Sequence, residues 1–534
     1  MPAIARAAKR LLLAALVIVG CLHTQAAFAH ASLIGVEPAD GSVIAAAPPS
    51  FSLAFSEPTS PLSLKLIGPD GIATSLDHFA LKDQTVDIAA PAALGNGTYV
   101  LSWRVVSEDG HPVGGSSVFS IGAPSANAPS AATVVIDWPV RFAVWAAKIG
   151  IYVGLFLGVG GAFFVTWIGG SSVPVRRFCG AMMALGFLAV PLSVGLQGLD
   201  ALELPLVAVA MPHVWTTGYG TSLGRLADLA LLSLILAAVA LPLRGWAGRL
   251  LAILGLGLVG AALASSGHAS AAAPQWLTRP AVFLHGIGIA FWAGALVPLA
   301  VTFASPSPDA AKTLRRFSAL VPLAVLPLVA AGLLLALIQL GTVDALWTTA
   351  YGIVFLVKLA LLAPLFLLAA INRFALTEPA EAGDPGAIRH LRHSVLAERV
   401  LVIAIFAVAA AWRFTPPPRA LAEAAAAPVS IHIHTAKAMA DLTLTPGRAG
   451  PVHASIVIMT GDFGPLDAKG VTLVLSNPAA GIEAIRRQAK KPGDGTWRVD
   501  DLLLPIPGRW TARLDILVSD FELVKLEDTI EIRP

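Results

Sequence analysis

The sequence has few charged residues. Asp, Glu, Lys and Arg together make up 13% of its 534 residues, about half the share of roughly 25% that is usual in soluble proteins. Hydrophobic residues reach 56%. They are concentrated in runs of about 20, the length that a helix needs to cross ~30 Å of hydrocarbon. A mainly soluble protein is therefore excluded, and a polytopic membrane protein is expected.

Other absences narrow the function. There are two cysteines, Cys21 and Cys179, so neither a disulfide framework nor a cysteine-based metal site can be built. The motifs GxxxxGK[ST] and HExxH are absent, so an ATP-driven pump or a hydrolase is not expected. The net charge of +3 is small and the basic residues are scattered in short loops. Nucleic acid is therefore not an expected partner.

The start of the chain has the pattern of a signal peptide, residues 1–29. Basic residues within 6–10 precede the apolar run 11–20, and Ala27-Phe28-Ala29 offers the small residues of a cleavage site. Cleavage after Ala29 would make His30 the first residue. A second interpretation is a lipoprotein, because the residues up to Cys21 resemble a lipobox. Lipidation at Cys21 would leave His30 inside the chain, without a free amine.

Two stretches have the short alternating pattern of β-strands bounded by turn residues. Residues 30–121 contain Pro-Asp-Gly and Asn-Gly turns between β-forming segments, and 430–534 repeat the pattern. Each stretch has about the length of a small β-sandwich, roughly 100 residues. The segments 122–138 and 414–429 are rich in Ala and Pro and are interpreted as linkers.

Between residues 139 and 413 the hydropathy predicts eight transmembrane helices. Their approximate ranges are 142–168, 178–199, 223–243, 248–266, 281–303, 317–340, 351–372 and 395–413.

The loops after the odd-numbered spans contain most of the arginines and lysines, and the opposite loops contain almost only Arg279. The positive-inside rule places the basic loops in the cytoplasm and both β domains outside. The signal peptide independently requires an exported N-terminus. The expected fold is an exported all-β sandwich, an eight-helix transmembrane bundle and a second exported all-β sandwich.

Cleavage after Ala29 would create a metal chelate. A terminal His30 offers its α-amine and its imidazole, while Asp109 and His111, two residues apart, project to one side of an extended strand. Such a set of nitrogen and oxygen ligands suits Cu(II). The alternative is a turn followed by an ordinary surface histidine. Residues 30–121 contain no methionine, which excludes a methionine-rich Cu(I) site there.

Residues 30–121 resemble the CopC family of periplasmic copper-binding proteins in "HASLIGVEPADGSVI", "LAFSEP" and "SEDGHPVGGSSVFSIG". The resemblance implies that His30, Asp109 and His111 bind Cu(II). The membrane region resembles CopD in "HGIGIAFWAGAL" and "YGIVFLVKLALL", and the C-terminal part resembles the YtkA group in "GTWRVDDLLLPIPGRWTARLDILVSDF". The order of the three parts is similar to that of copper proteins of the YcnJ type.

Polar side chains within the spans are costly and merit attention. His268 and His285 are placed near the external mouth of the bundle, and imidazole suits copper, so they are candidate ligands of a membrane copper path. The alternative is hydrogen bonding between helices. Lys148 and Lys358 would repel copper and are interpreted as structural or gating residues. For Lys358 we expect a carboxylate or carbonyl partner.

The C-terminal domain has a further candidate site. His432 and His434 alternate, so both imidazoles lie on one face of the predicted strand, and His453 is expected on a neighbouring strand. The set could bind a metal. The alternative is an exposed polar face of a sandwich.

The expected function is capture of Cu(II) in the periplasm, outside the inner membrane of a bacterium, and movement of copper across or into that membrane, without enzymatic activity. Import is the direction that the resemblance to CopD implies. A separate reductase and a periplasmic copper donor or acceptor are expected partners, besides the copper ion and the bilayer. Two alternatives are a delivery or resistance scaffold that hands copper to an acceptor and a redox enzyme with a terminal histidine chelate.

Overall fold

The computed structural model describes residues 33–38, 42–55, 58–107, 112–125, 137–304, 308–426, 428–435, 437–461, 464–493, 495–519 and 522–533. Within them it contains an N-terminal β domain, eight helices long and apolar enough to cross a membrane, and a C-terminal β domain. The predicted fold class is confirmed. The chain separates into two compact units, and residues 133–419 with all the spans belong to one of them. Each domain is therefore described by itself.

The N-terminal domain consists of two sheets with the strand orders β1-β3-β7-β6 and β2-β9-β8-β4-β5. The strands are β1 (Leu33–Glu37), β2 (Val43–Ile44), β3 (Ser50–Phe55), β4 (Thr59–Ile67), β5 (Ala73–Ser75), β6 (Phe79–Lys82), β7 (Thr85–Ala89), β8 (Gly97–Ser107) and β9 (Pro112–Ile121). Alternate residues of β3 are buried because successive side chains of a strand point to opposite faces. The rings of Phe51 on β3 and Phe119 on β9 lie 5.6 Å apart between centroids. This contact joins the two sheets in one core.

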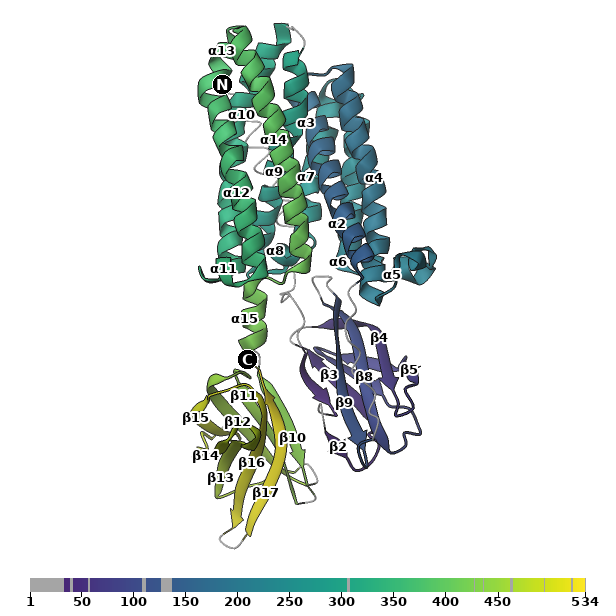
Figure 1. Cartoon of the computed structure of the whole chain (residues 1–534), viewed down its shortest axis with the longest axis vertical. Helices are drawn as coiled ribbons and strands as arrows, with labels where there is room; N and C mark the ends of the chain where they lie inside the picture. Colours follow the sequence, from purple (N-terminus) through teal and green to yellow (C-terminus); the bar gives the residue numbers. More distant parts are fainter. Residues whose placement is uncertain are drawn as a thin grey trace. The chain divides into compact units, whose positions relative to one another are not determined.

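The eight spans run side by side in Figure 1. Span one consists of α2 (Trp138–Tyr152), the π-helix η1 (Val153–Val159) and α3 (Gly160–Trp167). The other spans are formed by α4 (Val173–Leu202), α6 (Ser222–Ala240), α7 (Trp246–Ala264), α9 (Gln275–Ala304), α10 (Pro308–Leu340), α12 (Ala350–Ile371) and α14 (Pro385–Ala411).

Shorter helices connect the spans. They are η2 (Leu206–Ala210), α5 (Pro212–Tyr219), α8 (His268–Ala271), α11 (Ala345–Thr348), η3 (Asn372–Leu376), α13 (Thr377–Glu381) and η4 (Trp412–Phe414). The segment predicted as a linker after the last span contains a further helix, α15 (Pro418–Ala426).

Span one is the most enclosed span. Of its most apolar window, 72% is buried, and glycines let its neighbours approach closely. A Cβ atom on Gly154 would lie 2.5 Å from the Cα of Gly186 on α4, and one on Gly160 would collide with the carbonyl oxygen of Ala290 on α9. Small residues at such crossings are the usual means of tight helix packing in membranes.

Spans six and seven are packed quite differently. Only 11% and 6% of their most apolar windows are buried. The helix α10 packs mainly against α9, and α12 packs mainly against α14. Their remaining faces form the outer surface of the bundle, which lipid would cover.

The C-terminal domain is a second pair of sheets, with the orders β10-β11-β12-β15 and β14-β13-β16-β17. The strands are β10 (Val429–His434), β11 (Ala438–Thr445), β12 (Gly450–Thr460), β13 (Gly470–Asn477), β14 (Ile482–Gln488), β15 (Trp497–Leu504), β16 (Gly508–Ser519) and β17 (Glu522–Ile532), with the 3-10 helix η5 (Pro478–Ala480) after β13. Trp510 is completely buried between the sheets.

Candidate functional site

The three predicted Cu(II) ligands, His30, Asp109 and His111, lie outside the described residues. In the sequence, His30 comes three residues before β1, and the other two lie between the end of β8 at Ser107 and the start of β9 at Pro112. The strands β1 and β8 belong to different sheets of the same domain. The copper site itself stays a prediction.

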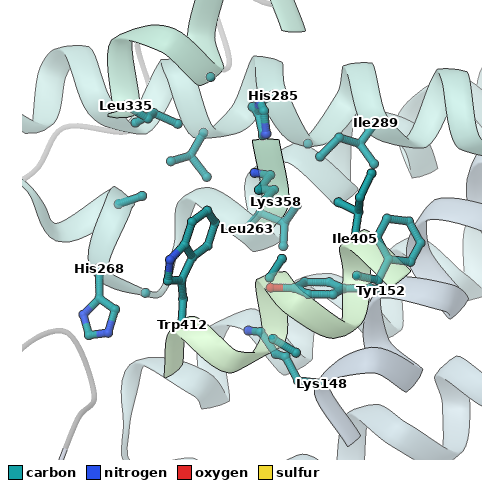
Figure 2. Close-up of a pocket in the computed structure, with 18 of the residues that line it drawn as sticks. Lys148, Tyr152, Leu263, His268, His285, Ile289, Leu335, Lys358, Ile405 and Trp412 are labelled. Atoms are coloured by element: carbon teal, nitrogen blue, oxygen red, sulfur yellow. The ribbon is translucent and has the colours of Figure 1, made fainter. Parts of the chain in front are cut away.

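Inside the membrane unit a cavity of about 580 Å³ is lined by residues from most of the spans, with His268 and His285 among them (Figure 2). Its size is within the range of small-molecule sites, about 300–1,000 Å³. Most of its lining side chains are apolar or aromatic. The two histidines that the sequence singles out as membrane ligands therefore line one cavity, although His268 lies on the connecting helix α8 and not within a span.

His285 is fixed by one ring nitrogen. Its Nδ1 lies 3.0 Å from the backbone oxygen of Leu328 on α10. Because a carbonyl oxygen only accepts, Nδ1–H donates, and this tautomer leaves a lone pair on Nε2. The contact is tight, since a Cβ on Gly332 would lie 3.0 Å from the Cε1 of His285. The ring thus has the orientation and tautomer of a potential ligand.

His268 lies on α8, in another part of the cavity. Its backbone oxygen accepts a hydrogen bond from Gln339 Nε2 at 3.0 Å. Figure 2 shows the ring of His268 well separated from that of His285, with Trp412 between them in this view. Among the residues with described positions, no group of three or more His, Cys, Asp or Glu is placed to hold a metal ion. The two histidines share a cavity, and they do not form a ligand cluster with a third such residue.

Both lysines of the spans also line the cavity. The Nζ of Lys148 lies 5.5 Å from the ring centroid of Tyr152, and the Nζ of Lys358 lies 4.8 Å from that of Trp412. The carboxylate or carbonyl partner expected for Lys358 is not found in the described part of the chain. The indole of Trp412 takes its place.

Trp412 is itself held firmly. Its Nε1 donates to the backbone oxygen of Tyr351 at 3.2 Å, and its ring stacks on that of Tyr351 with 5.2 Å between centroids. The next residue, Arg413, donates to Asp200 Oδ2 at 2.5 Å. The sequence analysis did not single out Trp412. Its contact with Lys358 depends on the packing of α12 against α14.

A buried carboxyl group was missed by the sequence analysis. Glu398 on α14 is only 2% exposed, and its Oε1 accepts a hydrogen bond from Asn372 Nδ2 at 2.6 Å. This bond joins the last span to the end of the span before it. A carboxylate inside a predicted span is a functional signal by itself, and Glu398 lies within the predicted range 395–413.

In the C-terminal domain, two of the candidate histidines lie on different strands, each beside a carboxylate. His432 Nδ1 lies 2.6 Å from Asp441 Oδ1 on the adjacent strand β11. His453 is on β12, so β11 lies between it and β10, and its Nδ1 is 3.5 Å from Asp500 Oδ1. The side chain of His434 is outside the described residues. His432 and His453 thus each have a separate carboxylate partner, and the expectation that His453 lies on the strand next to β10 is wrong.

Comparison with known proteins gives matches in the N-terminal β domain and in the last three spans of the membrane region. Residues 33–122 match the model of the CopC domain, and 311–412 match that of copper resistance protein D. Copper transport protein CutJ of Bacillus subtilis is 25% identical over 93% of this chain and 95% of its own length.

Two further relatives match the N-terminal domain. Copper resistance protein C of Xanthomonas campestris pv. juglandis is 34% identical over 20% of this chain and 89% of its own length. The crystal structure of CopC from Methylosinus trichosporium OB3b aligns with 26% identity over 19% of this chain and 100% of its own, with a TM-score of 0.16.

Proposed function

Because the chain belongs to the CopC/CopD type of copper proteins, we propose that it captures Cu(II) outside the inner membrane and moves copper across or into the membrane, in the direction of import. The observation that carries this proposal is the extent of the similarity. It runs through 93% of the chain, from the CopC domain into the CopD region, in a relative named as a copper transport protein.

Capture is assigned to His30, Asp109 and His111. Once the leader is removed, the α-amine and the imidazole of His30 form one chelate, and His111 and Asp109 complete a set that favours Cu(II). The even number of spans supports a periplasmic location for this site. An even number returns the chain to the side on which it began, so both β domains face the periplasm if the basic loops are cytoplasmic.

The test begins with the mature N-terminus of the full chain, determined by mass spectrometry. We expect it to start at His30, and a lipidated start at Cys21 would contradict the amine chelate. Electron paramagnetic resonance of the purified chain should then show a tetragonal Cu(II) centre that His30→Ala and His111→Ala abolish. His78→Ala, an exposed histidine of the same domain, is the matched control and should leave the spectrum unchanged.

A second candidate function is delivery of copper to a periplasmic or membrane acceptor without transport. The cavity favours it, because the charged residues that line it are basic and none of the described lining residues is Asp or Glu. A metal cation would be repelled there. In this case the membrane region anchors and positions the copper-binding domain.

A copper-depleted deletion strain separates the two functions. Transport requires a fall in intracellular copper on deletion, whereas delivery requires unchanged intracellular copper with loss of metal from a membrane or periplasmic copper enzyme. We also propose that the protein is not an enzyme and that a separate reductase supplies electrons if copper enters as Cu(I). Turnover of ascorbate and oxygen by the purified chain would contradict that statement.

A further inference from the structure

The membrane cavity has an unbalanced charge. Its lining includes Lys148, Lys358 and Arg413, and no acidic residue among the described positions faces it. Arg413 is paired with Asp200 at 2.5 Å. For the two lysines, no carboxylate within ion-pair distance is found in the described ranges. The cavity therefore has two uncompensated ammonium groups.

Aromatic rings compensate these charges only in part. A cation over a ring gains about 0.5–2 kcal/mol, whereas a lysine at the centre of a span costs about 2.5–3.5 kcal/mol by insertion measurements. Each lysine has one such ring, Tyr152 or Trp412. In the view of Figure 2 the hydroxyl of Tyr152 lies between the two amino groups. A bound molecule with negatively charged oxygens would provide the electrostatic stabilisation of the two ammonium groups that the rings do not provide.

The cavity also reaches the lipid-facing surface. Among its lining residues, Leu333 on α10 is 61% exposed and Leu359 on α12 is 41% exposed on the outside of the bundle. These two helices pack mainly against α9 and α14, respectively. An apolar chain could thus extend from the cavity along α10 and α12 into the bilayer without leaving an apolar environment.

We propose that this cavity binds an anionic amphiphile, with a carboxylate or phosphate head at Lys148 and Lys358 and an apolar tail toward α10 and α12. The bound anion neutralises the two ammonium groups and removes the barrier that they present to a copper cation. The proposal rests on the cavity and its charges, so it stands whether the protein transports or delivers copper.

The test uses the full-length chain, delipidated in a neutral detergent, and native mass spectrometry. The probes are palmitate for the carboxylate source, dioleoyl phosphatidic acid for the phosphate source and dioleoyl phosphatidylcholine as the zwitterionic comparison. We expect one tightly bound molecule of palmitate or phosphatidic acid, and the preferred one identifies the head group. Equal binding of the zwitterionic lipid would overturn the proposal.

Variants locate the site. Lys148→Met together with Lys358→Met should weaken binding of the anionic probe by roughly tenfold or more, since two charge-assisted contacts are lost. Lys358→Arg, which keeps the charge, should retain most of it. Lys312→Met, at an exposed lysine of α10 outside the cavity, is the matched control. Unchanged binding in the double variant would refute the site.

The same samples keep this proposal separate from the copper function. Cu(II) binding by the double variant, followed by electron paramagnetic resonance, should equal that of the wild type, and a Tm in detergent no lower than that of the wild type shows that the membrane unit is folded. Absence of lipid selectivity in the wild type, with an intact copper signal, contradicts only the amphiphile site. Loss of the copper signal in the wild type, with amphiphile binding intact, contradicts only the capture site.

Discussion

Span one and span seven are both apolar helical segments of the same bundle, yet 72% of the apolar window is buried in the first and 6% in the second. Composition does not explain the difference, because span seven has the higher mean hydropathy, 2.6 against 2.0. In a membrane, lipid solvates apolar side chains as well as protein does, so hydropathy does not decide which helix is central. Small residues that permit close backbone contact decide which helix is central, and span one has such residues at Gly154 and Gly160.

The match to copper resistance protein D covers 311–412, which includes spans six, seven and eight. These are the three least buried spans, so close packing is a poor explanation for the similarity. They do contribute walls of the cavity, including Lys358 and Trp412.

The largest effect is expected from filling the close approach in span one. Gly160→Leu would drive a side chain into the backbone of α9 at Ala290, and we expect a loss of about 3 kcal/mol or more, at the upper end for overpacking. Gly257→Leu on α7 is the control, because nothing lies within 4 Å of its Cβ position. Thermal unfolding in detergent should show a much lower Tm for the first variant only. Equal Tm values would refute the central role of span one.

A smaller effect is expected at the bond between spans seven and eight. Asn372→Leu leaves the buried carboxyl of Glu398 without its 2.6 Å hydrogen bond, which should cost about 1–3 kcal/mol. Adding Glu398→Leu removes the stranded group and should restore part of the stability. A double-mutant cycle on Tm measures the coupling. Strict additivity of the two substitutions would mean that the bond does not hold these spans together.

The ion pair at the other end of the last span should contribute less. Asp200→Asn breaks the 2.5 Å contact with Arg413, in which both side chains are partly buried. We expect a loss of about 1–2 kcal/mol, between the values for exposed and buried pairs. Because the pair is partly shielded, raising the salt concentration should reduce the difference only slightly. A difference that vanishes in high salt would indicate a fully solvated pair.

The smallest effect is expected for an exposed pair in the N-terminal domain. The hydrogen bond from Lys82 lowers the pKa of Asp87. At pH values above the unfolded pKa of about 3.9, the lowered pKa of Asp87 in the folded state means that the charged pair stabilises the fold. This stability is lost as the pH falls through the folded pKa. Lys82→Gln should therefore lower Tm marginally near pH 6 and not at all near pH 2. An effect that grows at acid pH would have the wrong sign for this pair.

The number of spans and the two β domains could be predicted because each depends on a local pattern. The ends of the spans were less predictable. Hydropathy placed the start of the last span near residue 395, while α14 begins at Pro385, because its first turns contain Arg389 and Arg392 and continue the helix beyond the apolar part. A hydropathy window detects the hydrocarbon crossing and not the end of the hydrogen-bonded helix.

The individual polar residues of the candidate site could be predicted from the sequence, but their arrangement around one cavity could not. Lys148, His285 and Lys358 stand out as polar groups within apolar runs, but the cavity that they share depends on how several spans pack. The partner of Lys358 was expected among carboxylates and carbonyls and proved to be an indole 54 positions away in the sequence, counted from Lys358 to Trp412. Side-chain periodicity within one helix contains no information on such contacts.

The position of Trp412 has one more consequence. Its indole lies under Lys358, while its backbone forms the first residue of η4, where the last span passes into the segment that leads to α15. The same residue therefore contacts a charged group of the cavity and forms the end of the last span.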